Sequence, residues 1–158
     1  MNWRRIEHVF MFTVICFIAL YMAAGVALQF LPVSLWVEYH KIYSPNEFNI
    51  INKDIPMVTE LTVHHNVHVK YNDILRCKKD ARSVWTYKGD QSTKHVLLEK
   101  APRYEAPWTY HQEAYDIEGP DECYIESTIK VEIPFGVEKY IKHNTPKFYM
   151  IEEPKDEG

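Results

Sequence analysis

Polar positions all but disappear from the first part of the chain. No charged residue occurs between Val9 and Leu31, a run of 23 residues. As an α-helix that rises about 1.5 Å per residue, this run reaches roughly 34 Å, enough to cross a hydrocarbon core of about 30 Å. A domain built from the rest of the chain has no room to bury a helix that is apolar on all sides. The pattern therefore predicts a transmembrane helix at 9–31 that contacts membrane lipid.

A cleaved signal peptide is the alternative for this segment. Met1 to Arg5 supplies a positively charged start, and Gly25, Val26 and Ala27 resemble a cleavage site with small residues. The apolar run is, however, longer than a usual signal sequence core, and it continues past that site. The sequence favours a retained anchor and leaves cleavage open.

The residues that flank the run predict its orientation. Arg4 and Arg5 precede it, and positively charged residues favour the cytoplasmic side of a membrane. Trp36, just beyond the run, suits the interfacial belt of aromatic residues. We therefore expect a cytoplasmic tail at 1–8, an extracytoplasmic domain at 35–152 and a frayed acidic tail at 153–158.

After Pro32 the hydrophobic period changes from that of a helix to an alternation typical of strands. Apolar and polar residues alternate from Cys123 to Ile133, which predicts a strand. A second long strand is predicted at 57–71, with His65 on its apolar face. Further strands are expected at 36–43, 75–78, 84–88, 94–100 and 147–152.

Several short strands separated by turns predict an all-β fold rather than a parallel sheet with helices. The leading architecture is an immunoglobulin-like β-sandwich preceded by one N-terminal transmembrane α-helix. The match to a true immunoglobulin domain is partial, because position 121 is Asp where that domain has a conserved tyrosine. The segment 101–120 contains Pro102, Pro107 and Pro120, and we expect it to form a long structured connection.

Two of the three cysteines belong to the predicted outer domain. Cys16 lies in the apolar run, which leaves Cys77 and Cys123 as a pair in a compartment that permits disulfides. We predict that these two are bonded, at a gain of about 4 kcal/mol in the chain-entropy model. Two buried free thiols are the alternative.

Charge and motifs exclude several classes of function. The chain has 18 basic and 22 acidic residues, a net charge of −4, which argues against nucleic-acid binding. His64 and His68 would stand about 13 Å apart on a strand, with His65 on the other face, so no metal site is predicted. No nucleophile elbow, phosphate loop or metalloprotease motif occurs, and we expect no enzyme, catalytic residue or cofactor.

Aromatic residues in the proline-rich segment are the candidates for partner binding. Trp and Tyr provide large contact areas at low cost in conformational entropy. The candidates are Tyr104, Trp108, Tyr110 and Tyr115.

A resemblance to a known group of proteins suggests a source and a cellular location. An N-terminal span, the segment 72–77, Trp85-Thr86-Tyr87, and Cys123 leading to Pro134-Phe135-Gly136 together resemble small membrane-anchored proteins of tailed bacteriophages. That family has no characterised activity, so the resemblance implies only a source and a layout. Together with the orientation inferred from the flanking arginines, it predicts a bacterial inner membrane protein with a cytoplasmic N-terminus and a periplasmic domain.

These observations predict a membrane-anchored interaction module that binds an unknown protein partner at the bacterial envelope. A structural subunit of a membrane or virion assembly is the second hypothesis, and a homo-oligomer would favour it. A metal-delivery assembly factor is the third, although the paired cysteines or methionines of such proteins are missing here.

Overall fold

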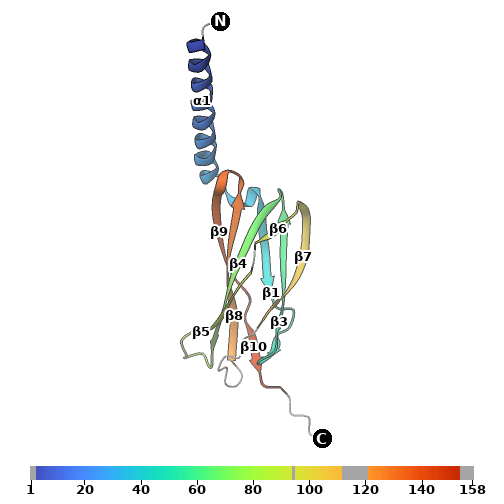
Figure 1. Ribbon diagram of the computed structural model, residues 1–158. Coiled ribbons are helices and arrows are strands. Elements are labelled where there is room, and N and C mark those ends of the chain that lie inside the picture. Colours follow the sequence, from blue (N-terminus) through green and yellow to red (C-terminus); the bar gives the residue numbers. More distant parts are fainter. Residues whose placement is uncertain (1–2, 94, 112–120, 154–158) are drawn as a thin grey trace.

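The computed structural model has one long helix followed by a β-rich domain (Figure 1). It describes residues 3–93, 95–111 and 121–153. The helix α1 spans Trp3–Phe30, and its part from Ile6 to Phe30 is long and apolar enough to cross a membrane, with no residue of its most apolar window buried by the protein. Tyr115 and most of the predicted acidic tail lie outside the described residues.

Two sheets make up the domain. After the short 3-10 helix η1 (Val33–Leu35), the small sheet has the order β1-β3-β7 and the large sheet β2-β10-β8-β4-β5, with β6 paired to β4 and β9 paired to β8. The bounds of the strands are β1 Val37–Tyr43, β2 Phe48–Ile50, β3 Ile55–Val63, β4 Val67–Lys78, β5 Thr86–Ser92, β6 Val96–Leu98, β7 Ala101–Tyr110, β8 Asp121–Ile133, β9 Val137–Asn144 and β10 Phe148–Ile151. Neither sheet closes into a barrel. The pairings are antiparallel except for that of β10 with β2.

Buried side chains from both sheets form one hydrophobic core. Along β8 every second residue is buried, from Asp121 to Ile133, and these residues face the small sheet, where Ile55, Met57 and Leu61 of β3 are buried as well. This alternation is the one that a sheet covered on one face requires. The all-β prediction is confirmed.

The helix contacts the domain at the tip of the β8–β9 hairpin. That tip is the 3-10 turn η2 (Pro134–Gly136), in which Phe135 packs edge-to-face on Tyr21 of α1 with ring centroids 4.9 Å apart. Lys139 of β9 also donates a hydrogen bond to the carbonyl oxygen of Gln29. The helix therefore packs against the large sheet.

The predicted strands differ from the structure in three ways. The strand expected at 57–71 is two strands, β3 and β4, and His64 and His65 are exposed in the turn between them. Residues 101–110 form β7 instead of a connection, because β7 pairs with β3 alone, and an edge strand tolerates prolines that lack an N–H group. β2 and β9 were not predicted.

Two aromatic residues also lie elsewhere than predicted. Trp36 is 8% exposed and packs in the core of the domain, so it does not stand free in an interfacial belt. Tyr110, a predicted contact residue, is 1% exposed and cannot offer a binding surface. Both side chains belong to the hydrophobic core, where burial of their large apolar area stabilises the domain.

One carboxylate lies in the core. Asp73 of β4 is 1% exposed and occupies an inward position between Tyr71 and Leu75. Burial raises the pKa of Asp73 to about 6, and the Ser127 hydroxyl, directly opposite on β8, lowers it by a smaller amount. The folded state therefore binds this proton more tightly than the unfolded state does.

We predict that Asp73→Asn removes a pH-dependent loss of stability. Ionisation of Asp73 opposes folding. The resulting loss of stability is absent below the unfolded pKa of 3.8 and is complete above the folded pKa of about 6. Between pH 4.5 and 7.5, the wild type should lose about 2 kcal/mol of unfolding free energy relative to the variant. Urea unfolding of the full-length proteins in detergent measures this difference, and parallel pH profiles would contradict it.

Candidate functional site

The candidate site lies on the outer face of the large sheet, at the end farthest from α1 (Figure 1). We call it the distal aromatic face. Its residues come from β2, β4, β8, β10 and the loops before β5 and β10: Phe48, Lys78, Trp85, Glu122, Tyr124, Lys147 and Tyr149.

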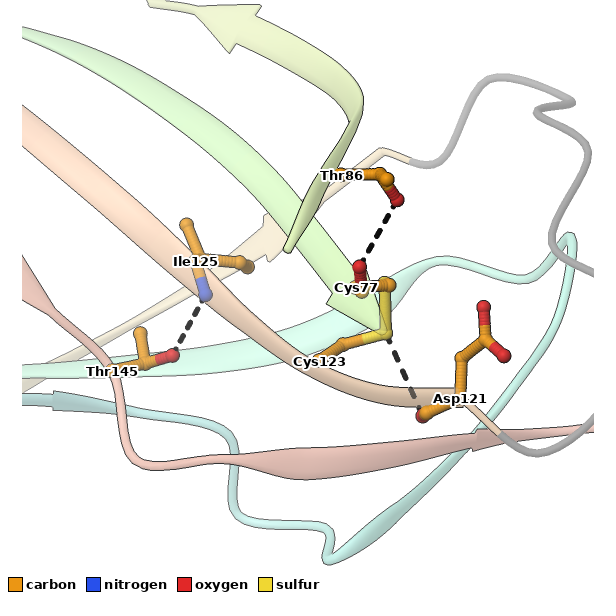
Figure 2. Close-up of a disulfide and its surroundings, with 6 residues drawn as sticks. All are labelled: Cys77, Thr86, Asp121, Cys123, Ile125 and Thr145. Carbon is orange, nitrogen blue, oxygen red and sulfur yellow. Dashed lines mark hydrogen bonds between the residues drawn. A yellow bond between two sulfur atoms is a disulfide. The ribbon is translucent and has the colours of Figure 1, made fainter. Parts of the chain in front are cut away.

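The disulfide that the sequence predicts lies directly beneath this face. Cys77 of β4 and Cys123 of β8 are register partners with Cα atoms 4.1 Å apart, and both side chains are fully buried (Figure 2). The Thr86 hydroxyl donates to the Cys77 carbonyl oxygen at 3.0 Å, which ties the start of β5 to the end of β4. Thr145 accepts a hydrogen bond from the Ile125 backbone N–H at 2.9 Å.

Strand alternation explains why the face is polar and aromatic above a sulfur bridge. Since successive side chains point to opposite faces, the inward Cys77 and Cys123 place Lys78, Glu122 and Tyr124 on the outside. The same rule applies to β10, where Phe148 is buried and Tyr149 is 40% exposed. The disulfide thus fixes the two central strands that carry the face.

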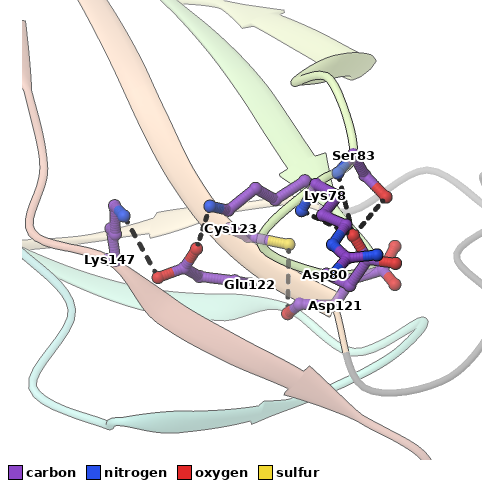
Figure 3. A network of polar contacts seen from close by, with 8 residues as sticks. Lys78, Asp80, Ser83, Asp121, Glu122, Cys123 and Lys147 are labelled. Atoms are coloured by element: carbon purple, nitrogen blue, oxygen red, sulfur yellow. Dashed lines mark hydrogen bonds and ion pairs between the residues drawn. The ribbon is translucent and has the colours of Figure 1, made fainter.

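One carboxylate and two lysines form the polar centre of the face (Figure 3). Glu122 accepts from Lys78 at 2.9 Å and from Lys147 at 3.2 Å. The hydrogen bond from Lys78 is the main reason that the pKa of Glu122 lies below its usual value, with Lys147 adding to the effect. Glu122 is therefore ionised at neutral pH and holds both ammonium groups in place.

Aromatic rings lie on both sides of this centre. Trp85 packs edge-to-face on Tyr124 with centroids 4.8 Å apart, and the Lys78 ammonium stands 4.8 Å from the Trp85 ring. On the other side, Phe48 and Tyr149 are stacked with centroids 5.8 Å apart, and Phe48 is 55% exposed. Such cation–π and ring contacts hold exposed aromatic groups in fixed orientations.

The loop that presents Trp85 is ordered by Asp80. Its carboxylate accepts from the backbone N–H groups of Arg82 and Ser83 at 2.7 and 2.8 Å, and from the Ser83 hydroxyl at 3.1 Å (Figure 3). These bonds hold the pKa of Asp80 below its ordinary value, with the Arg82 N–H as the largest cause. A shallow pocket of about 330 Å³ lies beside this loop and reaches Tyr149.

The residues predicted to bind a partner are not part of this face. Tyr104 and Trp108 are half-buried on β7 and pack against the core, and the indole N–H of Trp108 donates to Thr59 at 2.9 Å. Phe48, Glu122 and Tyr149 were missed as site residues. The alternation in β8 could have indicated Glu122, whereas the three-residue β2 gives no periodic signal for Phe48.

The groups of the distal aromatic face are held in fixed positions. Within the described residues, no three His, Cys, Asp or Glu side chains are grouped so that they could hold a metal ion. The face offers fixed rings, two cations and one anion on a rigid sheet. Exposed aromatic rings of this kind are enriched at surfaces that contact proteins.

Comparisons with known proteins give no family. No family model and no curated protein matches the sequence. Among solved structures, the chain is similar to the alkylpurine DNA glycosylase AlkC of Pseudomonas fluorescens bound to DNA containing an abasic site analog, with a TM-score of 0.45 and 11% identity over 73% of this chain and 30% of that one.

Two further structures are similar at lower scores. The sporulation control protein Spo0M of Bacillus subtilis has a TM-score of 0.39 and 9% identity, over 75% of this chain and 51% of that one. A β-glucosidase of Listeria innocua in complex with gluconolactone has a TM-score of 0.32 and 8% identity, over 71% and 16%. The chain thus spans about a third of the first structure and half of the second, and TM-scores below 0.5 support no argument about function.

We predict that loss of the disulfide weakens the whole domain. The bond closes a loop with a sequence separation of 46 residues, so replacing both cysteines by alanine should lower the unfolding free energy by about 4 kcal/mol. Urea unfolding of the full-length double variant measures the loss. The matched control is Cys16→Ala in α1, which should leave the β domain as stable as the wild type; equal stability of the double variant would contradict the prediction.

Proposed function

We propose that the protein is a membrane-anchored interaction module that binds a protein partner through the distal aromatic face. The observation that carries this proposal is the cluster of fixed rings and charges at the end of the domain farthest from α1. A helix that holds one end of the domain at a membrane leaves the opposite end accessible to other proteins. The anchor and the binding face therefore have complementary roles.

The chemistry of the face favours a partner with both apolar and charged groups. Phe48 and Tyr149 supply apolar area, and Lys147 is half-exposed, so an acidic side chain of the partner can approach it. Aromatic residues held in place before binding lose little conformational entropy when they bind. No catalytic step is part of the proposal.

We propose the same setting that the sequence predicts. The arginines before α1 support a cytoplasmic N-terminus, and a disulfide in the domain suits the oxidising periplasm of a bacterium. The resemblance to phage-encoded membrane proteins supports a bacterial inner membrane. A role in which the phage acts on the host envelope would follow from that source.

We also propose that the domain is an open β-sandwich of the immunoglobulin-like kind, since two mainly antiparallel sheets share one core. Its disulfide differs from that of antibody domains. It joins neighbouring strands of one sheet, whereas the bond in antibody domains joins two sheets. The sulfur bridge here reinforces one sheet rather than the packing of one sheet on the other.

Photo-crosslinking in living cells tests the binding face. A benzophenone side chain in place of Phe48 or Tyr149 should give a crosslinked protein partner, whereas the same group at Tyr140 should not. Tyr140 is the matched control because it is 62% exposed and lies on β9, which leads away from the membrane-side tip of the large sheet.

Four results would count against the proposal. Equal crosslinking at Tyr140, or none at Phe48 and Tyr149, would contradict a distal binding face. Crosslinks between two copies of the chain would favour the structural-subunit hypothesis instead. A partner that binds equally well to purified Phe48→Ser and Tyr149→Ser variants would also overturn the assignment.

A further inference from the structure

A second site lies between the two sheets, away from the distal aromatic face. It is a cavity of about 340 Å³, at the small end of the range for ligand pockets. Its walls come from β3 and β7 of the small sheet, from β4, β5 and β6 of the large one, and from Thr93 just after β5. The lining residues are Thr59, Tyr71, Asp73, Gln91, Thr93, Val96, Leu98, Ala106, Trp108 and Thr109. Val96 is 43% exposed and Thr109 is exposed, so the cavity opens to solvent at this side.

Most polar groups of the cavity already have partners. The Thr59 hydroxyl accepts from Trp108 at 2.9 Å, and the Thr93 hydroxyl accepts from the Tyr71 backbone N–H at 3.0 Å. Gln91 bridges the two sheets, since its amide oxygen accepts from the His111 N–H at 2.7 Å and its nitrogen donates to the Thr109 carbonyl oxygen at 3.4 Å. These groups shape the cavity and leave little polar capacity for a ligand.

Asp73 is the exception. Neither of its carboxylate oxygens has a hydrogen-bond partner within the described residues, and no described Lys or Arg forms an ion pair with it. The Ser127 hydroxyl opposite lowers the pKa of Asp73, but as a single O–H donor it can satisfy one oxygen of Asp73 at most. At least one oxygen remains for a donor from outside the protein.

The position of this carboxylate is costly unless something binds to it. The other inward side chains of β4 are Val67, Val69, Leu75 and Cys77, all apolar and buried, and the half-buried Tyr71. A buried carboxylate without a donor costs several kcal/mol relative to one in water. Residues that oppose local stability in this way commonly belong to functional sites.

The titratable groups that face Asp73 are tyrosines. The hydroxyl oxygens of Tyr39 and Tyr71 are 2.8 Å apart, and burial raises the pKa of Tyr71 to about 12 and that of Tyr39 still further. Tyr104 lies near these two tyrosines, and burial likewise raises its pKa. All three are neutral at physiological pH, so Asp73 is the one source of charge among them.

From this geometry we propose that the cavity is a binding site for a compact, largely apolar molecule with one protonated amino group. The ammonium group donates to the free oxygen of Asp73, and the apolar body lies against Leu98, Ala106 and Trp108. An aryl-alkyl amine of about ten heavy atoms matches both the volume and the single charge. The site is independent of the distal aromatic face, so either assignment can fail without the other.

The test uses the full-length protein in lipid nanodiscs, labelled with 5-fluorotryptophan. Trp108 lines the cavity, and its fluorine resonance is assigned by its loss in Trp108→Phe. The probe is 2-phenylethylamine, and 2-phenylethanol is the control of the same shape without the positive charge. A resonance at the site distinguishes binding from partition of the probe into lipid.

Two variants separate recognition of charge from occupation of space. Asp73→Asn should weaken binding of the amine at least tenfold and leave the affinity for the alcohol unchanged. Ala106→Phe should fill the cavity from β7 and block both probes, while Asp73 stays in place. Unfolding curves of each variant show whether it is folded. Asp73→Asn should be more stable than the wild type at neutral pH, so its loss of amine binding would report the loss of charge.

The amine should shift the Trp108 resonance at concentrations at which the alcohol does not. Equal affinity for both probes, or amine binding that survives Asp73→Asn, would overturn the role of the carboxylate. A Trp108 resonance that does not move at millimolar amine would overturn the site itself, and the photo-crosslinking result at Phe48 and Tyr149 would not change.

Discussion

The pairing of β4 with β8 is the interaction on which the rest of the domain depends. The two strands are in register over eleven residue pairs, from His68 opposite Glu132 to Lys78 opposite Glu122, and the disulfide closes the far end of this ladder. One face of the ladder packs against the hydrophobic core. The other carries the distal aromatic face at one end, and β8 continues at the opposite end into the turn that contacts α1.

The same ladder links the two proposed sites while keeping them separate. Asp73 and Ser127 are opposite each other in its middle and face inward to the cavity, whereas Lys78 and Glu122 are opposite each other at its end and face outward. Because a strand presents alternate residues to opposite sides, one pair of strands can carry a polar surface and a buried ligand site. A ligand in the cavity would contact the strands that carry the binding face without reaching the face itself.

The sequence was most informative where one pattern had one interpretation. The apolar run before Pro32 predicts a helix at 9–31, and the observed helix covers this run to Phe30 but begins earlier, at Trp3. The alternation from Cys123 to Ile133 predicts nearly all of β8. The turn at His64 was missed because Val63 and Val67 are separated by an even number of positions, so the alternation of β3 continues in phase into β4. β7 was missed because its prolines exclude a central strand but not an edge strand.

The candidate sites were less predictable because they depend on contacts between distant segments. Aromatic residues suit a core as well as a surface, and only the packing of the sheets shows that Tyr110 is buried and Tyr149 is exposed. Asp73 follows Asn72, a pair typical of turns, so the sequence gives no sign that its carboxylate lies inside a strand and faces the core. The cavity exists only where β7 lies opposite β4 and β6.

We propose that α1 anchors a domain displayed outside the cytoplasm, and labelling of one introduced cysteine tests this topology. In a Cys16→Ser background, Tyr140→Cys places a thiol at a position that is 62% exposed on β9. A membrane-impermeant maleimide added to intact bacterial spheroplasts should label this thiol at once. Labelling only after the cytoplasmic membrane is opened would place the domain inside the cell and contradict the account.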